Sequence, residues 1–405
     1  MTLVNTLRGL AWCAAVLVGA MTLVACGSGG NSNSAASSAP LADNVVPIMV
    51  AKGLDRVANI GTVSVTLCAA GNAAQCQTLD NIQLDTGSYG LRVVAAELSP
   101  ALRSALQQAT VPNSNAPLAS CALFADGYSF GSVRIADVTL GRRTASAIPI
   151  QLIGDPNFPA VPSDCVVGRS ENATSELHAR GILGVGAAAV DCGNQCAANA
   201  AASSYFNCAS ASSCVPTVVP LAQQIANPVA NMPIDNNGVI VDMPAIGPSG
   251  QSSASGTLLL GIGTASNNRL GSSAMVLTTD GFGSFSATYN GSTITAFTDT
   301  GSNGLFFTDA SLPACGSGNP FYCPPGQQVK TITVKGANGA AQAVHLNVGN
   351  ASMLLSTPNT FAFNDLAGPM PRYFDLGMPF FYGRRVAVAI SGKSTPSGNG
   401  PYVAF

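Results

Sequence analysis

Charged side chains are scarce in this 405-residue chain: Asp, Glu, Lys and Arg together make up only 9% of it, against a usual share of about a quarter. The 17 Lys and Arg residues form no cluster, and the net charge is −2. A nucleic-acid-binding protein needs a basic surface that matches the phosphate backbone. The composition therefore excludes that class of function, and we expect no nucleic-acid partner.

Histidine is almost absent, which limits two kinds of catalysis. The chain has only His178 and His345, which are not spaced as an i, i+4 pair of metal ligands. No Gly-Xaa-Ser-Xaa-Gly elbow stands in a strand-to-helix setting, as a Ser/His hydrolase of the common type would require. We therefore expect neither a catalytic metal nor a cofactor.

Long apolar runs are also missing, apart from one near the start. Residues 10–24 follow Arg8 and are uncharged and mostly apolar, but these 15 residues are short for a membrane-spanning helix, which needs about 20. The run closes with Leu23-Val24-Ala25-Cys26, a lipobox-like string. We expect residues 1–25 to be a lipoprotein signal peptide and Cys26 to carry the lipid. An uncleaved membrane anchor is the alternative.

The segment that follows predicts a tether rather than a domain. Residues 26–44 are mostly Gly, Ser, Asn and Ala, which bury too little surface to offset the entropy of ordering. Gly27 stands where an Asp would favour retention in the inner membrane. We therefore expect a protein of the bacterial cell envelope, lipid-anchored in the outer membrane and facing the periplasm or the exterior.

Removal of residues 1–25 leaves 380 residues, more than the roughly 250 to 300 at which a single core usually splits. We expect two lobes, at 45–235 and 236–405. Gly, Ser, Thr, Asn and Val are abundant while Glu and Lys are scarce, which favours strands over helices. Alternation predicts strands at 131–140, 328–334, 344–348 and 385–390, and short helices are expected at 97–108 and 220–227.

Of twelve cysteines, Cys13 belongs to the signal peptide and Cys26 to the lipid site, so ten remain in an exported chain. An even number in an oxidising compartment predicts disulfide bonds. Local pairing joins Cys68 with Cys76 and Cys315 with Cys323. Four more cysteines lie in one Ala/Ser-rich segment and are expected to pair locally, which leaves Cys121 with Cys165 by elimination. The four are Cys192, Cys196, Cys208 and Cys214, for which a zinc site is the alternative.

One short string occurs twice, as Asp85-Thr86-Gly87-Ser88 and Asp299-Thr300-Gly301-Ser302. A hairpin pattern precedes each copy, at 62–84 and, around Asn290-Gly291, at 284–297. Two short strings that end in Leu-Gly follow, Ile182-Leu183-Gly184 after the first copy and Asp375-Leu376-Gly377 after the second. Each half of the chain therefore repeats one plan in one order, which turn chemistry alone does not explain.

Two carboxyls in contact can hydrolyse an amide, because one takes a proton from water while the other donates one to the carbonyl oxygen. Aspartic proteases are a standard example of two Asp carboxyls that share one proton. We therefore assign Asp85 and Asp299 as the catalytic pair. The other residues of each string support this assignment. Gly87 and Gly301 permit a tight loop, and Thr86 and Thr300 should hydrogen-bond across the junction between the loops. The hydroxyls of Ser88 and Ser302 should donate to the outer carboxyl oxygens.

With these strings the chain resembles the pepsin-like aspartic proteases over nearly all of its mature length. Four further segments carry the resemblance: 180–186, 256–263, 374–390 and 401–405. It implies a mainly β, bilobal acid-protease fold, with two pseudo-twofold-related β lobes and a cleft between them. It also implies an endopeptidase that acts as a monomer on polypeptide substrates. The chain also resembles a family of bacterial lipoproteins of unknown function.

The resemblance places a flap hairpin at 124–131, where the pepsin-like enzymes close a Tyr over the cleft. Phe124 stands at that Tyr position, and Asp126, Gly127 and Tyr128 complete the candidate flap. Asp375-Leu376-Gly377-Met378 replaces the usual Leu-Gly-Asp. Two functions are therefore kept: an aspartic endopeptidase, and a bilobal binding or structural lipoprotein that cuts nothing.

Overall fold

The computed structural model describes residues 41–405, except 211, 212 and 317. The predicted signal peptide, Cys26 and most of the predicted tether lie outside these residues. Residues 42–405 form one compact unit. Within the described part, no helix has both the length and the apolar character needed to cross a bilayer.

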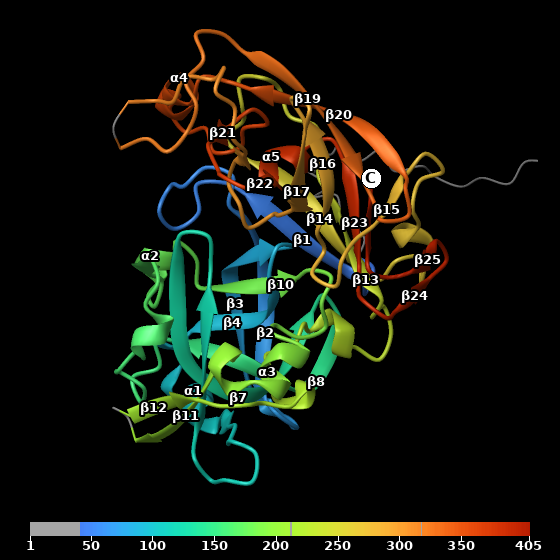
Figure 1. The fold of residues 1–405 in the computed structure, drawn as a ribbon. Helices are drawn as coiled ribbons and strands as arrows, with labels where there is room; N and C mark the ends of the chain where they lie inside the picture. The colour runs from blue at the N-terminus through green and yellow to red at the C-terminus, as the bar shows by residue number, and fades with distance from the viewer. Residues whose placement is uncertain (1–40, 211–212, 317) are drawn as a thin grey trace, which may run out of the picture. The chain divides into compact units, whose positions relative to one another are not determined.

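The protein is mainly β, as its composition predicts, and most strands belong to two sheets (Figure 1). The large sheet has 17 strands: β1 Val45–Val50, β2 Gly61–Ala69, β3 Asn72–Asp85, β4 Tyr89–Val94, β5 Gln107–Gln108, β6 Leu118–Leu123, β7 Gly127–Leu140, β8 Arg143–Ile153, β9 Arg169–Ser170, β10 Gly181–Val185, β11 Tyr205–Ser210, β12 Ser213–Pro216, β13 Gly238–Asp242, β14 Ala254–Leu260, β15 Val276–Thr278, β23 Arg385–Ala389 and β26 Tyr402–Ala404. The second sheet has seven: β16 Phe285–Tyr289, β17 Ser292–Thr298, β18 Leu305–Phe306, β19 Gln328–Lys335, β20 Ala341–Val348, β21 Ala367–Gly368 and β22 Tyr373–Leu376. A separate short pair joins β24 Ser394–Thr395 and β25 Gly398–Asn399.

The helices are few and short. They are α1 Pro100–Ala105, α2 Thr174–Leu177, α3 Asn194–Ala198, α4 Ala351–Ser356 and α5 Met378–Phe381. The strands expected from alternation are confirmed, and α1 accounts for part of the helix expected at 97–108. The helix expected at 220–227 is wrong, because only the 3-10 turn Leu221–Gln223 forms there. The backbone of Ile225 is bonded elsewhere, since its N–H donates to the Tyr205 hydroxyl and its carbonyl accepts from Asp191 N.

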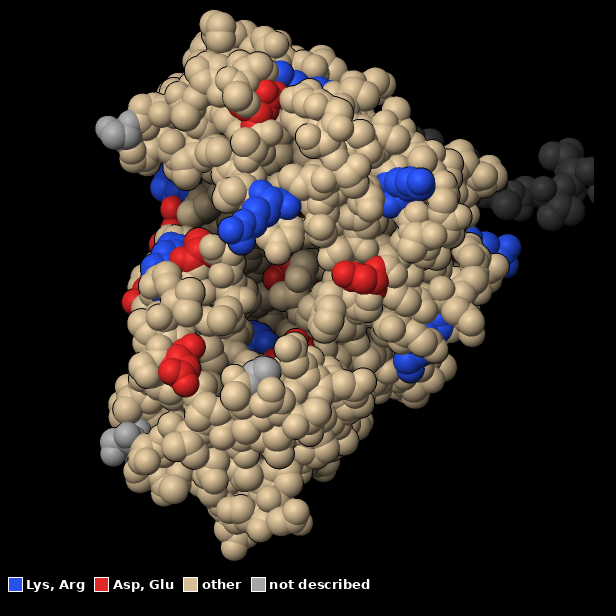
Figure 2. Space-filling model, viewed as in Figure 1, with Lys and Arg blue, Asp and Glu red and all other residues tan. Residues whose placement is uncertain are grey.

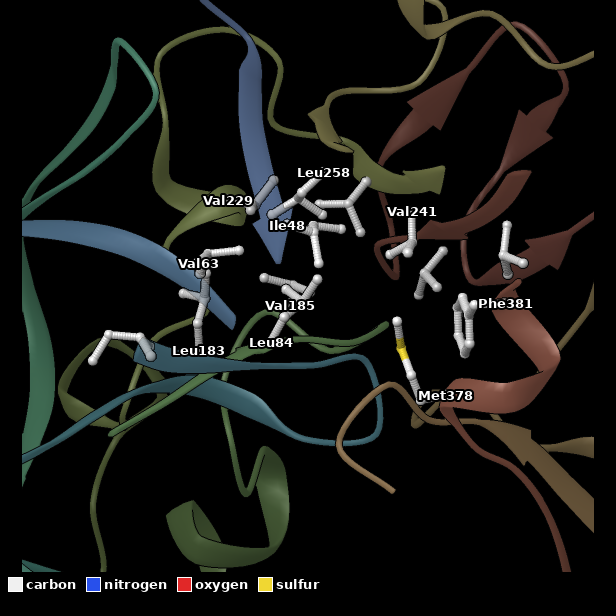
Figure 3. Packing of buried hydrophobic residues seen from close by; sticks show 14 of the residues in the cluster. Ile48, Val63, Leu84, Leu183, Val185, Val229, Val241, Leu258, Met378 and Phe381 are labelled. Carbon is white, nitrogen blue, oxygen red and sulfur yellow. The ribbon is translucent and has the colours of Figure 1, made fainter. Parts of the chain in front are cut away.

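Strand β1 belongs to the first predicted lobe, but it pairs with strands on both sides of the lobe boundary expected at residue 235. It pairs with β14 over all six of its residues and with β2 at its end. Alternate β1 side chains are buried, as the period of a strand facing a core requires. Figure 3 shows Ile48 of β1 between residues from both parts of the sequence, with Leu84 and Leu183 on one side and Leu258 and Val241 on the other. The two predicted lobes therefore share one hydrophobic core.

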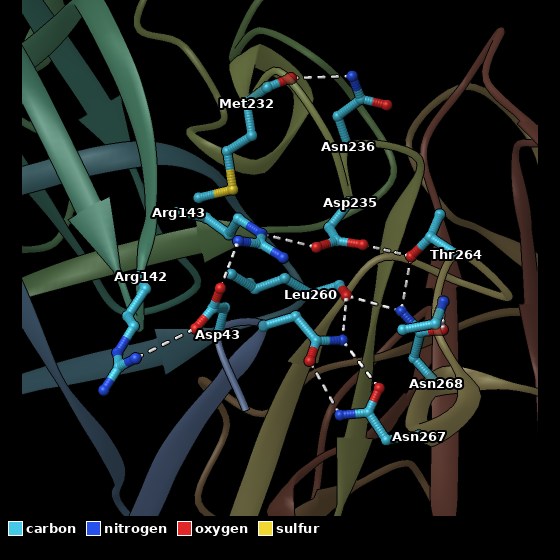
Figure 4. Close-up of polar contacts among 12 residues, drawn as sticks. Asp43, Arg142, Arg143, Met232, Asp235, Asn236, Leu260, Thr264, Asn267 and Asn268 are labelled. Atoms are coloured by element: carbon cyan, nitrogen blue, oxygen red, sulfur yellow. Dashed lines mark hydrogen bonds and ion pairs between the residues drawn. The ribbon is translucent and has the colours of Figure 1, made fainter. Parts of the chain in front are cut away.

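A polar cluster fixes the first described residues against this core (Figure 4). Asp43 forms ion pairs with Arg142 at 3.4 Å and Arg143 at 3.2 Å, and Arg143 also pairs with Asp235 at 2.8 Å. The Asp235 carboxylate accepts a hydrogen bond from the Thr264 hydroxyl. The chain from residue 43 onward is therefore joined to the start of β8 and to the segment that follows residue 235.

Five disulfide bonds confirm the predicted cysteine chemistry. The pairs are Cys68–Cys76, Cys121–Cys165, Cys192–Cys196, Cys208–Cys214 and Cys315–Cys323. The zinc alternative for the four-cysteine excursion is wrong, because all four of its thiols are used in disulfides. Among the described residues, no group of three or more His, Cys, Asp or Glu side chains is arranged to hold a metal ion.

Candidate active site

Both Asp-Thr-Gly-Ser loops begin where the second strand of a hairpin ends. β3 pairs with β2 and ends at Asp85, while β17 pairs with β16 and ends at Thr298, one residue before Asp299. The next strands start soon after, β4 at Tyr89 and β18 at Leu305. Each loop is therefore a short link held between two paired strands, as the repeated hairpin pattern predicts.

A third strand lies between the two arms of each loop. β10 pairs in parallel with β3 and antiparallel with β4, and β22 pairs in the same two ways with β17 and β18. A Cβ on Gly184 would lie 2.5 Å from Tyr89 N, and one on Gly377 would lie 2.0 Å from the Gly304 carbonyl oxygen. No side chain fits at such distances, which explains why both strings end in glycine.

The two loops bring the carboxyls of Asp85 and Asp299 into contact. A Cβ on Gly87 would lie 2.7 Å from Asp299 Cγ, and a Cβ on Gly301 would lie 2.7 Å from Asp85 Cγ. Each loop therefore lies directly against the carboxyl of the other, and Asp85 is only 7% exposed. Like charges at this separation cannot both persist, so the pair holds a proton and titrates as a unit.

The two threonines hold the loops together through reciprocal hydrogen bonds, as predicted. The N–H of Thr86 donates to Thr300 Oγ1 at 3.1 Å, and the N–H of Thr300 donates to Thr86 Oγ1 at 3.0 Å. Each hydroxyl then donates across the junction, that of Thr86 to the Thr298 carbonyl and that of Thr300 to the Leu84 carbonyl. Both threonines are buried, so these bonds are shielded from competing water.

The hydrogen bonds to the two carboxyls differ. Asp85 Oδ1 accepts from the N–H groups of Gly87 at 2.7 Å and Ser88 at 3.1 Å. Asp299 Oδ1 accepts from Gly301 N at 2.7 Å, and its Oδ2 accepts from the Ser302 hydroxyl at 2.9 Å. The expected hydroxyl donation to an outer oxygen is thus present for Asp299. Ser88 Oγ is buried and makes no such hydrogen bond of normal geometry, although this hydroxyl lies close enough to Asp85 to lower the pKa of its carboxyl.

Burial is the main cause that raises the pKa of Asp85 well above its usual range, and the charge of Asp299 raises it further. The Ser88 hydroxyl and the Gly87 N–H lower this pKa, but burial and Asp299 outweigh them. The same order of causes, burial before carboxylate charge, raises the pKa of the Tyr89 phenol. Asp85 therefore has the properties of the protonated member of the pair. Asp299 is the carboxyl that accepts a hydrogen bond from a loop hydroxyl, that of Ser302.

Two neighbours of the pair were not predicted as site residues. The Gln83 amide donates to the Gly301 carbonyl at 2.7 Å, and the Tyr89 hydroxyl donates to the Phe282 carbonyl at 2.5 Å. Both bonds join the two halves of the chain, and Tyr89 and Phe282 also line a cavity of about 190 Å³ beside Thr86. Only their position next to the first repeated string could have indicated them, since neither has a motif of its own.

Asp375, the carboxyl that opens the second glycine-ended string, also lies near the pair. It is 1% exposed, and its Oδ1 has no hydrogen-bond partner. Burial first, and then the charges of Asp299 and Asp85, raise its pKa well above the usual range, whereas the Ser302 hydroxyl lowers it. Figure 2 shows a hollow in one face of the molecule with acidic atoms visible in its depth.

The candidate flap is a hairpin of β6 and β7, in which Phe124 N donates to the Gly127 carbonyl at 2.8 Å. Phe124 is half-buried and packs against an apolar cluster that includes Ile182 of β10. Tyr128 is 9% exposed and packs in a different cluster, around the Cys121–Cys165 disulfide. Phe124 is therefore the aromatic side chain at the turn, and Tyr128 belongs to the core.

The other two flap candidates lie against the segment 163–171, which we call the strap. Asp126 is exposed and pairs with Arg169 at 2.8 Å. Gly127 is buried opposite Arg169 in the parallel pairing of β7 with β9, where a Cβ would lie 2.6 Å from the Arg169 carbonyl oxygen. The Cys121–Cys165 disulfide adds a covalent link between β6 and the strap. The hairpin tip is therefore fixed to the strap on both of its strands.

Comparison with curated proteins finds no match to this sequence. A family model described as Protein of unknown function (DUF3443) matches residues 40–405, which includes all of the part that the structure describes. The match includes both hairpin-fed loops, the strap and the buried Asp375. The chain therefore belongs to the DUF3443 family.

Proposed function

We propose that the protein is an aspartic endopeptidase that hydrolyses peptide bonds with a water molecule activated between Asp85 and Asp299. The observation that carries this proposal is the reciprocal bonding of the two loops, in which Thr86 and Thr300 exchange hydrogen bonds and the carboxyls meet at their centre. A structural role would need one such turn, not two that meet face to face at a buried junction.

The matched surroundings of the two loops support a pepsin-like, bilobal arrangement. Each Asp follows a hairpin, and a strand that ends near a glycine lies between the two arms of each loop. The registers of these strands also correspond, because Gln83 is opposite Ile182 in the first half and Phe297 is opposite Asp375 in the second. Two copies of one unit related in this way favour a pseudo-twofold axis between the carboxyls. The cleft of such a fold would receive an extended polypeptide across that axis.

The unequal hydrogen bonding supports a proposal for the two roles. Asp299 acts as the base and removes a proton from water, whose oxygen bonds to the carbonyl carbon while Asp85 gives its proton to the carbonyl oxygen. When the resulting diol collapses, the carbon–nitrogen bond breaks and the proton on Asp299 passes to the departing nitrogen. Asp85 regains its proton from a diol hydroxyl, so the pair returns to its starting state.

The experiment compares the purified full chain with Asp85→Asn and a matched control, Asp164→Asn, an exposed carboxyl on the strap. An unfolded polypeptide is the substrate, and a statine-type peptide is the inhibitor. Loss of a general acid lowers the rate by about 10²-fold to 10⁴-fold, so D85N should be nearly inactive while D164N and the parent cut equally. Equal cleavage by all three, or cleavage that the statine peptide does not block, would remove the proposal.

The second candidate is a binding lipoprotein that keeps the carboxyl pair but cuts nothing. The fixed hairpin favours it, because the turn at Phe124 is joined to the strap by a disulfide and by β9 and Tyr128 is packed in the core. Such a protein would bind the statine peptide, and D85N would weaken that binding, yet no substrate would be cleaved. Both candidates share the location proposed from the sequence, with the chain lipidated at Cys26 in the cell envelope and working as a monomer.

A further inference from the structure

Two carbonyl groups of the second loop accept hydrogen bonds from side-chain amides. The Gln83 amide donates to the Gly301 carbonyl at 2.7 Å. The Asn59 amide donates to the Asn303 carbonyl at 2.9 Å. Both donors belong to the first half of the chain, 218 and 244 positions before the carbonyls that they bind. The loop that carries Asp299 is therefore held on its far arm by the other half of the molecule.

Asn59 is fully buried and uses every hydrogen-bonding position of its amide. Besides its bond to Asn303, the amide nitrogen donates to the Phe363 carbonyl at 2.9 Å. The amide oxygen accepts from the N–H of Phe363 at 2.8 Å and from the Tyr382 hydroxyl at 3.0 Å. These four bonds leave the amide one orientation, so the donor to Asn303 is itself fixed.

The first loop is not held in this way, although the two halves of the chain repeat one plan. Gln83 lies two residues before Asp85. The corresponding residue, two before Asp299, is Phe297, which has no donor on its side chain. Among the hydrogen bonds of the described residues, none runs from a side-chain amide to a carbonyl of residues 86–88. The difference favours the loop of the carboxyl that we propose as the base.

We propose that Asn59 and Gln83 are positioning residues, which anchor the second loop and so hold Asp299 in place against the first loop. The groups that bond Asp299 lie between the anchors, because Gly301 N donates to its Oδ1 at 2.7 Å and the Ser302 hydroxyl donates to its Oδ2 at 2.9 Å. The anchoring of the loop is independent of any activity. Its effect on catalysis rests on the proposed peptidase function.

The test uses variants of the full chain that keep the size of a side chain and remove its N–H donors. Asn59→Asp and Gln83→Met do this for the two anchors. Asn237→Asp is the matched control, because Asn237 is 7% exposed and its amide also donates to two carbonyls, those of Ile262 and Ser394. Neither carbonyl belongs to a reacting loop.

Hydrogen exchange of residues 299–304 reports the anchoring whether or not the protein cuts anything. Asn59→Asp and Gln83→Met should each speed exchange in this segment about tenfold, because a carbonyl of the loop loses its donor. Asn237→Asp should leave exchange in the segment unchanged. Equal protection in the parent and both anchor variants would overturn the inference. An equal rise in Asn237→Asp would also overturn it, since the effect would then be a general loosening.

The rate of peptide cleavage is the second readout. A misplacement of about 1 Å can cost about 10²-fold in rate, so Asn59→Asp should lower kcat by about 10-fold to 100-fold. KM for the same peptide should stay within about twofold, because the substrate-binding surface is unchanged. Asn237→Asp should keep kcat within about twofold of the parent. A higher KM with an unchanged kcat in Asn59→Asp would refute the positioning role.

The two readouts separate the two proposals. Absence of cleavage by the parent removes the peptidase function, yet the exchange result still decides whether the amides anchor the loop. Asn59→Gly keeps the test valid if Asn59→Asp does not fold, because residue 59 has a φ of 59° and glycine adopts this backbone without strain. This variant also lacks the donor to Asn303, and unchanged exchange at 299–304 would again overturn the inference.

Discussion

Replacement of Glu171 by Gln should stabilise the protein at pH 8 and leave its stability unchanged near pH 4. Glu171 is 3% exposed on the strap, and burial is the main cause that raises its pKa from 4.5 to about 7. The charge of Asp126 adds to the rise, while Arg169, 3.2 Å away, opposes it. The folded state therefore binds the Glu171 proton more tightly than the unfolded chain does.

The sign and the size follow from this shift. A raised carboxyl pKa contributes stability that is fully present below pH 4.5 and is lost as the pH rises through about 7. At 1.36 kcal/mol per pKa unit, the loss at pH 8 is on the order of 3 kcal/mol. Glutamine stays neutral at every pH, so Glu171→Gln should recover about that amount at pH 8.

Urea unfolding of the oxidised protein at pH 4 and pH 8 measures this difference. Asp126→Asn, which removes only the like charge, should recover a smaller part of it and serves as the graded control. The reasoning fails if Glu171→Gln is less stable than the parent at pH 8. That result would mean that the ion pair with Arg169 outweighs the cost of burying the Glu171 charge.

Three further changes test the loops and the strap. Gly87→Ala places a Cβ 2.7 Å from Asp299 Cγ, so it should separate the carboxyls, abolish cleavage and lower the free energy of unfolding by about 1–3 kcal/mol in urea titrations. Thr300→Val leaves the Thr86 N–H and the Leu84 carbonyl without their hydrogen bonds and should lower the free energy of unfolding by about 1–3 kcal/mol in the same titration. Thr300→Ser keeps the hydroxyl and should cost much less, and equal losses would contradict the role of the hydroxyl. Joint replacement of Cys121 and Cys165 by Ser opens a link with a sequence separation of 44 residues and should lower the free energy of unfolding by about 4 kcal/mol. Proteolysis at the hairpin should also become faster. An unchanged proteolysis pattern would show that the disulfide does not hold the hairpin.

The sequence was sufficient for the parts of the site that repeat. Two copies of Asp-Thr-Gly-Ser, each with a hairpin before it and a glycine-ended string after it, predicted the loops and the contact between them. Local pairing of neighbouring cysteines predicted Cys68–Cys76 and Cys315–Cys323 for the same reason, since both depend on residues close in the chain or on a pattern that occurs twice. Cys121–Cys165 followed only by elimination.

Features that depend on unrepeated, long-range contacts were not predictable. The pairing of β1 with β14 joins residues about two hundred positions apart, and alternation in β1 predicts a strand but not its partner. A short helix was expected at 220–227, yet the hydrogen bonds of Ile225 with Tyr205 and Asp191 hold this segment in another conformation. Asp375 was visible only as a departure from a family pattern, because its burial depends on how β22 enters the second sheet.

The attachment of the hairpin to the strap constrains how anything could reach the surface that this hairpin covers. A hairpin held only at its base can swing alone, but here the Cys121–Cys165 bond and the β7–β9 pairing make hairpin and strap one moving body. Any lift of the turn must therefore carry residues 163–171 with it.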